Sequence, residues 1–123
     1  MKEAIIYYAK TPHPAHNKYW GKKYKEAHWD HDSDTISIKK GFFKRYWRKL
    51  PVKEMVDEYN LDGSLEKLFA KYNQGNNPLA TFSGQKIVRD KGVHTSMSVE
   101  DVVKIGTKYY MVSGMGFKKI KFV

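Results

Sequence analysis

Apolar residues near the start of the chain follow the spacing of β-strands. The near-continuous apolar run in Lys2–Ala9, KEAIIYYA, predicts a first strand that is buried on both faces. In residues 35–39, TISIK, Ile36 and Ile38 alternate with polar residues, which predicts a half-buried strand. We therefore expect two strands in the first third of the chain.

The last third of the chain also has the composition of β-structure. Three short apolar stretches, DVVKI, KYYMV and FKKIKF, are separated by turn residues at 106–107 and 113–116. Turns this short join consecutive antiparallel strands, so this region predicts a β-meander. The residues expected to share one face of that sheet are Val103, Ile105, Tyr109 and Met111.

The middle of the chain has helical spacing. Residues 41–50, GFFKRYWRKL, repeat apolar residues at helical intervals and turn their basic residues away. Pro51 fits the first position of a second helix, where its missing N–H costs nothing, and Ser64 fits the N-cap of a third. The one-face stripes are Val52, Met55, Val56 and Tyr59 in the second helix and Leu65, Leu68, Phe69 and Tyr72 in the third.

These elements predict an α+β fold in one domain, residues 1–123. A small antiparallel sheet, made of the C-terminal meander and the N-terminal strand, is expected to be covered by two or three short helices. Residues 11–17, 30–34 and 73–85 have the proline, glycine, asparagine and aspartate content of loops. A chain of 123 residues fits a single domain.

Composition narrows the class of protein. The chain has no cysteine, which excludes a disulfide framework and thiolate-bound zinc. The N-terminal residues lack the order of a signal peptide, and their apolar run is too short to span a membrane. We expect a soluble protein of the host cell cytoplasm that makes no contact with a membrane.

Positive charge is the strongest compositional signal. Lys and Arg number 23 against 13 acidic residues, for a net charge of +10, which favours attraction to polyanions. In residues 39–49 six of eleven residues are cationic and four are aromatic, the combination that binds phosphates and stacks on bases. Residues 18–25 repeat this combination. The predicted contact residues for nucleic acid or a partner are Lys39, Lys40, Lys44, Arg45, Arg48, Lys49, Lys22, Lys23 and Trp20.

An ordinary amphipathic helix explains residues 39–49 equally well. Its aromatic rings would pack inside the protein, and its charges would only be solvated. The acidic residues of the next two predicted helices also fit a solvated face, or a surface that orients the protein on a partner. Those acidic residues are Glu54, Asp57, Glu58, Asp62 and Glu66.

Two further clusters suggest chemistry only weakly. Imidazole and carboxylate groups gather at His13, His16, His28, His31, Asp30, Asp32 and Asp34. They lie on expected loops without the spacing of a known metal motif, so we predict no metal or cofactor. His94 lies beside Thr95, Ser96 and Ser98, but hydroxyls before a strand more often bind backbone groups. We predict no catalytic residue and no enzymatic activity.

The second half of the chain carries a recognisable order of motifs. SMSVEDVV, KYYMV and GFKKI follow one another after SLEKLFAKYN and NPLA. Residues 64–120 thereby resemble the YodL-like domains of small proteins from phages and conjugative elements. The matching positions are Ser96, Met97, Ser98, Val99, Asp101, Val102, Tyr109, Tyr110, Gly116 and Phe117. Glu100 departs from the family pattern, in which Gly or Ser is commoner, and nothing before Ser64 matches.

The resemblance implies a mobile-element setting and interference with a host system, but no particular reaction. The motif residues themselves fit structural roles. Asp101 can accept hydrogen bonds from backbone N–H groups before its strand, and Gly116 permits a turn or bulge with positive φ.

The function predicted from the sequence is that of a non-enzymatic phage or mobile-element accessory protein. It would bind nucleic acid or a host nucleoprotein through the basic aromatic surface, with a possible anti-defence role. One alternative is a protein-interaction module that inhibits a host protein by meeting an acidic patch on it. A metal-dependent enzyme is the other.

Overall fold

The computed structural model describes residues 1–10, 27–30, 35–114 and 116–123. In chain order its elements are β1 (Lys2–Ala9), β2 (Ala27–Asp30), β3 (Thr35–Ile38), α2 (Lys40–Tyr46), β4 (Trp47–Lys49), β5 (Glu54–Val56), α3 (Leu61–Lys71), the 3-10 helix η2 (Pro78–Ala80), α4 (Phe82–Lys91), β6 (Val102–Ile105), β7 (Lys108–Ser113) and β8 (Gly116–Phe122). The predicted α+β class is confirmed. None of the described helices is long and apolar enough to cross a membrane.

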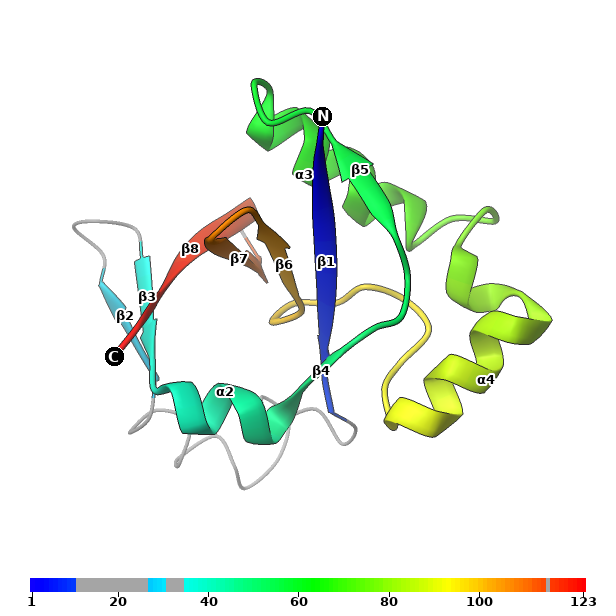
Figure 1. The fold of residues 1–123 in the computed structure, drawn as a ribbon, viewed down its shortest axis with the longest axis horizontal. Helices are drawn as coiled ribbons and strands as arrows, with labels where there is room; N and C mark the ends of the chain where they lie inside the picture. The colour runs from blue at the N-terminus through cyan, green and yellow to red at the C-terminus, as the bar shows by residue number, and fades with distance from the viewer. Residues whose placement is uncertain (11–26, 31–34, 115) are drawn as a thin grey trace.

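One curled sheet organises the described chain (Figure 1). Its strands lie in the order β2-β3-β8-β7-β6-β1-β4. Strand β5 pairs with the start of β1, along the same edge of β1 as β4. The meander β6-β7-β8 is antiparallel, as predicted, and β1 closes onto β6. The pairing of β3 with β8 is parallel, unlike the other pairings, so the sheet is mixed.

Helix α2 lies across the opening of the curl (Figure 1). It connects β3 to β4, which occupy nearly opposite ends of the strand order. Helices α3 and α4 lie on the other side of β1. The sheet therefore has a concave face toward α2 and a second face toward α3.

Each face of the sheet packs a core of its own. The alternation in β1 places Ala4, Ile6 and Tyr8, all fully buried, in the core with α3. Tyr7 and Ala9 point the other way, into the core with α2. The prediction that β1 is buried on both faces is thus right for its second half, where the chain needs apolar residues at successive positions.

The predicted common face of the meander is wrong in its pairing. Val103 and Ile105 lie in the core with α3, whereas Tyr109 and Met111 lie in the core with α2. The two-residue turn at 106–107 sets Lys104 opposite Tyr109, and residues opposite each other share a face. The register therefore places Tyr109 on the concave side.

The first predicted helix ends earlier than its spacing suggests. Helix α2 stops at Tyr46, and Trp47–Lys49 becomes strand β4 along Tyr7–Ala9. The indole Nε1 of Trp47 donates to the backbone oxygen of Glu100 at 2.7 Å. Pairing with β1 and this buried hydrogen bond outweigh the local helical period, because tertiary contacts override weak propensities.

The second predicted helix is wrong. Residues after Pro51 run to the short strand β5, in which Glu54 and Val56 are buried while Met55 is 49% exposed. This is the period of a strand, and Tyr59, expected on the buried stripe, is 91% exposed. Glu54 is buried because Lys71 Nζ and the Tyr72 hydroxyl donate to its carboxylate at 2.9 Å and 2.8 Å.

The third predicted helix is confirmed as α3, with a different cap. The side chain of Asn60 accepts a hydrogen bond from the backbone N–H of Gly63 and caps the helix. Ser64 lies one turn inside the helix, where its hydroxyl accepts from the backbone N–H of Asp57 and donates to the backbone oxygen of the same residue. Leu65, Leu68 and Tyr72 are buried, as the stripe predicts.

The predicted loop at 73–85 hides two helical segments. Asn77 caps η2 and Thr81 caps α4, each by accepting a backbone N–H. Asn, Pro and Thr suit loops and helix starts alike, so composition does not separate the two.

Candidate nucleic-acid interface

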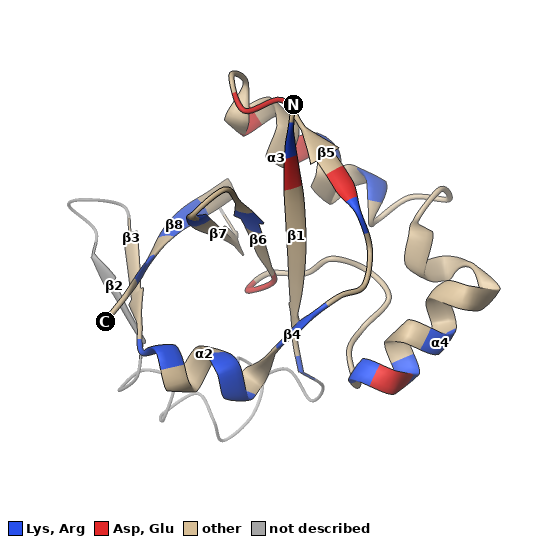
Figure 2. Ribbon diagram, viewed as in Figure 1, with Lys and Arg blue, Asp and Glu red and all other residues tan. Residues whose placement is uncertain are grey.

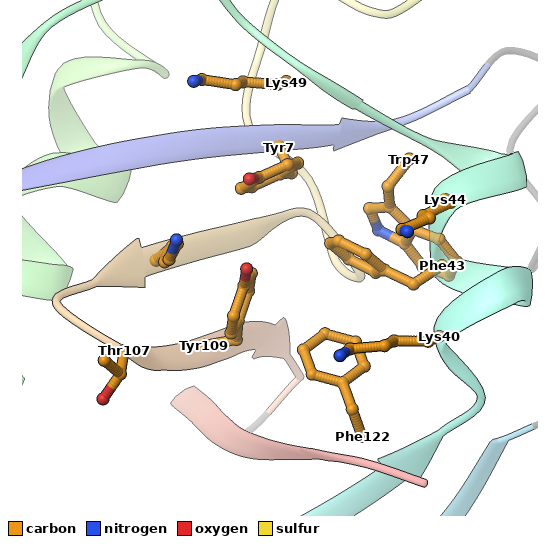
Figure 3. A pocket seen from close by; sticks show the side chains of 10 residues that line it. Tyr7, Lys40, Phe43, Lys44, Trp47, Lys49, Thr107, Tyr109 and Phe122 are labelled. Carbon is orange, nitrogen blue, oxygen red and sulfur yellow. The ribbon is translucent and has the colours of Figure 1, made fainter.

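A pocket of about 630 Å³ opens between α2 and the concave face of the sheet (Figure 3). This volume lies within the roughly 300–1,000 Å³ that is usual for ligand pockets. Side chains from α2, β1, β4, β6, β7, β8 and the turn between β6 and β7 form its wall. The lysine-ringed pocket, as we call it, is lined by Tyr7, Lys40, Phe43, Lys44, Trp47, Lys49, Lys104, Thr107, Tyr109 and Phe122.

Aromatic rings form the apolar wall of this pocket. Phe43 is at their centre and stacks on Trp47, with ring centroids 5.3 Å apart and an interplanar angle of 18°. Tyr7, Tyr109 and Phe122 approach the Phe43 ring with centroid distances of 5.3, 5.8 and 5.2 Å. These tilted and edge contacts suit ring quadrupoles and fix the rings against one another. The wall is therefore a rigid set of planar surfaces.

Two tyrosine hydroxyls add polar groups to the wall. The rings of Tyr7 and Tyr109 lie 5.9 Å apart, and both residues are half-buried. Burial, and next the interaction with the Tyr109 hydroxyl, raise the pKa of Tyr7 above its ordinary value. The Tyr7 hydroxyl is consequently neutral at physiological pH and able to donate and accept hydrogen bonds.

Four lysines surround the aromatic wall. Lys40 and Lys44 are four residues apart on α2 and are both exposed, so they lie on one side of the helix. Lys49 pairs with Tyr7 across β4 and β1, and the Lys104 ammonium lies 5.4 Å from the centre of the Tyr109 ring. Among the described residues that line the pocket none is acidic. The pocket is therefore both apolar and positively charged.

The predicted contact residues separate into three groups. Lys40, Lys44 and Lys49 line the pocket, whereas the exposed Lys39 and Arg45 do not. Lys22, Lys23 and Trp20 lie outside the described residues.

Arg48 has a structural task at the end of α2. Its Nη1 donates to the backbone oxygens of Lys44, Arg45 and Trp47 at 3.4, 2.9 and 3.2 Å. The Lys44 and Arg45 carbonyls are among those that the end of a helix leaves without intrahelical partners. Arg48 therefore stabilises α2 and is not part of the pocket wall.

Five pocket residues lie outside the predicted basic aromatic segment, residues 39–49: Tyr7, Lys104, Thr107, Tyr109 and Phe122. Their contribution depends on which strands are neighbours, and β1 lies about a hundred residues from β7 in the sequence. In the sequence, the signal that could have pointed to this site was a lysine, Lys104, that shares one face of the meander with aromatic residues. The amphipathic-helix alternative is right about packing, because Phe42, Phe43 and Trp47 are at most 7% exposed.

The weaker clusters of the sequence gain no support as reactive sites. Within the part of the chain that the structure describes, no group of three or more metal-binding side chains converges. His13, His16, His31, Asp32 and Asp34 lie outside that part. Near His94, Thr95 Oγ1 accepts from Gln85 and Ser98 Oγ donates to the Ser96 backbone, which are structural hydrogen bonds.

Asp101 has the structural role that the sequence predicts. Its carboxylate accepts the backbone N–H groups of Ala9 and Ser98 at 2.9 and 2.7 Å, which ties β1 to the start of β6. Burial raises its pKa to about 8, against the lowering effect of these two hydrogen bonds. Gly116 has a φ of 108°, as expected for the turn before β8.

Charge is segregated along the molecule (Figure 2). Lys and Arg mark α2, β4, β6 and β8 around the concave face, and acidic residues gather near the start of β1, β5 and the start of α3. The acidic set is not the outer face of two helices, because Glu54 belongs to a strand and is buried. Figure 2 also shows Lys and Arg on α3 and α4, so positive charge is not confined to the end with the pocket.

The fold and the pocket together define a small α+β protein with a cationic aromatic pocket. No protein-family model matches the chain, and no solved structure matches it. Over 61 residues the chain is 49% identical to an uncharacterized protein of Acanthamoeba polyphaga mimivirus, a match that covers 50% of this chain and 56% of the viral protein. The chain thus spans little more than half of that protein. Half of the chain is thus similar to a viral protein, which fits a viral accessory protein in general.

Proposed function

We propose that this protein is a non-enzymatic accessory protein of a virus or mobile element that binds nucleic acid through the lysine-ringed pocket and the cations around it. A host nucleoprotein complex, such as a defence effector, would present the same phosphates and bases. The setting is supported by the viral relative and by the resemblance of residues 64–120 to YodL-like domains.

The observation that carries this proposal is the combination of four lysines with exposed parts of aromatic rings in one concave site. Lysines gain affinity for nucleic acid by releasing counterions from phosphates, and aromatic rings stack on bases. A cationic ligand would be repelled by the lysines, and an uncharged ligand would leave their charge unused. A ligand with both negative charge and flat rings fits best.

Charge reversal on α2 tests the proposal. Lys40→Glu with Lys44→Glu should weaken binding to a labelled single-stranded oligonucleotide by at least tenfold in fluorescence anisotropy. A glutamate at position 40 suits the helix dipole in the first turn of α2, whereas one at position 44 opposes it in the last turn, so circular dichroism must accompany the binding measurement. Lys86→Glu with Lys91→Glu on α4 is the control, because both lysines are exposed and the net charge changes equally.

The outcome separates charge in general from this site. Equal loss in both double variants would show that only the net charge of the molecule attracts the oligonucleotide. Unchanged binding in both would contradict the proposal.

The alternative of a protein-interaction module uses the same lysines against an acidic partner. The segregation of charge in Figure 2 favours a surface that orients the protein on such a partner. Capture of partners from the native host, with and without nuclease, distinguishes the two functions. Protein capture that survives nuclease and fails with the Lys40→Glu, Lys44→Glu variant would support the alternative.

A further inference from the structure

We propose that the lysine-ringed pocket holds one unpaired nucleotide, with its base against the aromatic wall and its phosphates at the lysine ring. This inference rests on the proposed function and narrows it from nucleic acid in general to a single-stranded chain read one nucleotide at a time. Three features of the pocket lead to it.

The first feature is the geometry of the aromatic wall. The rings of Tyr7, Phe43, Tyr109 and Phe122 contact one another, with centroids 4.8–5.9 Å apart, and meet at angles of 46° to 89°, so they form an uneven wall instead of one flat platform. A flat platform suits a run of stacked bases. An uneven wall suits a single planar group that lies against it in the pocket.

The second feature is the placement of charge relative to the rings. Lys40 and Lys44 extend from α2 toward the aromatic rings (Figure 3). The other two lysines of the pocket are on strands, Lys49 on β4 and Lys104 on β6. Cations on both sides of the wall match a ligand whose central ring is flanked by negative groups. One nucleotide within a strand has this form, because a phosphate lies on each side of its sugar and base.

The third feature is the type of cation. Lysines form point contacts with single phosphates, whereas arginines give the two-pronged contacts that favour the dianionic phosphate of a phosphotyrosine. Neither Arg45 nor Arg48 lines the pocket, and Arg48 donates to three backbone oxygens instead. The pocket therefore favours the singly charged phosphates of a nucleic acid backbone over a phosphopeptide.

Access favours an unpaired base. In a duplex both faces of each base are covered by neighbours, so rings inside a pocket cannot reach them without unstacking. Duplex DNA also places its phosphates on the outside of a wide rod, which would meet the outer lysines alone. A flexible strand can insert one base and keep its phosphates at the rim.

An oligonucleotide without bases tests the inference on the unaltered protein. We expect a single-stranded decamer to bind more tightly than a decamer of abasic nucleotides with the same number of phosphates. The expected difference is about 5- to 150-fold, because stacking of one base contributes about 1–3 kcal/mol. A 2-aminopurine in the decamer should lose fluorescence on binding as it stacks on the rings. A duplex of the same sequence should bind more weakly than the single strand.

A pair of variants on β7 locates the stacking. Tyr109→Leu should abolish the 2-aminopurine quenching, whereas Tyr110→Leu should leave it intact. Tyr110 is the neighbouring half-buried tyrosine, and it faces the core with α3 on the opposite side of the sheet. Circular dichroism should show that both variants are folded.

The results distinguish this inference from the proposed function. Equal affinity for the normal and abasic decamers, with loss of both in Lys40→Glu, Lys44→Glu, would keep nucleic-acid binding and overturn the nucleotide pocket. Adenosine monophosphate that competes as strongly as the decamer would assign the pocket to a free nucleotide, which has the same chemistry. A phosphotyrosine peptide that displaces the decamer more efficiently than unlabelled decamer would overturn the inference.

Discussion

Gly84 is the glycine with the least room for a side chain among those that the structure describes. A Cβ atom there would lie 2.3 Å from the Pro78 oxygen and 2.5 Å from the Leu79 Cα, both backbone atoms that cannot rotate away. Helix α4 thus packs directly on η2 through a bare helix surface. This contact explains why a glycine is found inside a helix, where it otherwise costs conformational entropy.

We predict that Gly84→Ala destabilises the fold by about 1–3 kcal/mol, as overpacking of a tight contact does. Gly75→Ala is the matched control, because no atom lies within 4 Å of its Cβ position and it should change stability by less than about 0.5 kcal/mol. Urea unfolding of the three proteins measures both effects. Equal stability of the two variants would show that α4 moves away from η2 at little cost.

Asp101 predicts a dependence of stability on pH. Its folded pKa of about 8 lies above its ordinary value of 3.8, so the folded protein holds a proton that the unfolded chain loses between these values. The free energy of unfolding should therefore fall as pH rises from about 4 to about 8, by up to about 1.4 kcal/mol per pH unit for one proton. Above pH 8 this contribution should be constant.

Asp101→Asn is the corresponding variant. Its amide oxygen can still accept from a backbone N–H, but the group no longer titrates, so the slope between pH 4 and 8 should flatten. The slope is the proper readout, because the substitution also lowers stability at every pH by weakening hydrogen bonds to Ala9 or Ser98. The same slope in both proteins would assign it to another group.

At the scale of elements, Lys44 in α2 and Arg48 in β4 are neighbouring cations with different tasks. Arg48→Ala should lower stability by about 0.5–1.5 kcal/mol, because the last carbonyls of α2 lose a donor. Its effect on oligonucleotide binding should be small. Lys44→Ala should have the reverse effects, with weaker binding and a stability within about 0.5 kcal/mol of the original.

Thermal unfolding and anisotropy on the same two variants check this separation. If Arg48→Ala weakened binding as much as Lys44→Ala while leaving stability unchanged, its role would be contact with the ligand.

Elements defined by their own residues were predictable from sequence. The strand β1, the meander and α3 each have enough residues of one period to identify them, and the turn at 106–107 is short enough to set antiparallel pairing. The strands β4 and β5 have three residues each and exist because β1 offers two free stretches of edge. Such strands have no period to detect.

The site was predictable only in part for the same reason. Lys40, Lys44 and Lys49 belong to one dense basic stretch, so composition found them. Tyr7 and Tyr109 join them only because β1 and β7 flank β6 in the sheet. Arg48 has the same composition signal as its neighbours, and only its hydrogen bonds reveal that it is structural.

The whole molecule carries a net charge of +10, and four of its lysines line the lysine-ringed pocket. Binding to a single strand should therefore weaken with salt. If each of the four pocket lysines neutralises one phosphate, the logarithm of the binding constant should fall against the logarithm of salt concentration with a slope of about −3.

The slope of this salt dependence also gives the number of phosphate contacts. Removal of one pocket lysine, as in Lys49→Ala, should make the slope shallower by about 0.7, whereas Lys67→Ala on α3 should leave it unchanged. A slope near zero would mean that phosphates do not contribute to binding. It would also remove support for an acidic protein partner, because that partner would be bound by the same lysines.

The parallel pairing of β3 with β8 determines when the pocket can form. Strand β3 leads into α2, and its hydrogen-bonding partner β8 includes Phe122, which also lines the pocket. During synthesis the basic helix therefore emerges about 80 residues before the strand that anchors it. The wall of the pocket is complete only when β8 has been made, so a chain that stops before β8 carries the basic residues of α2 without Phe122 beside them.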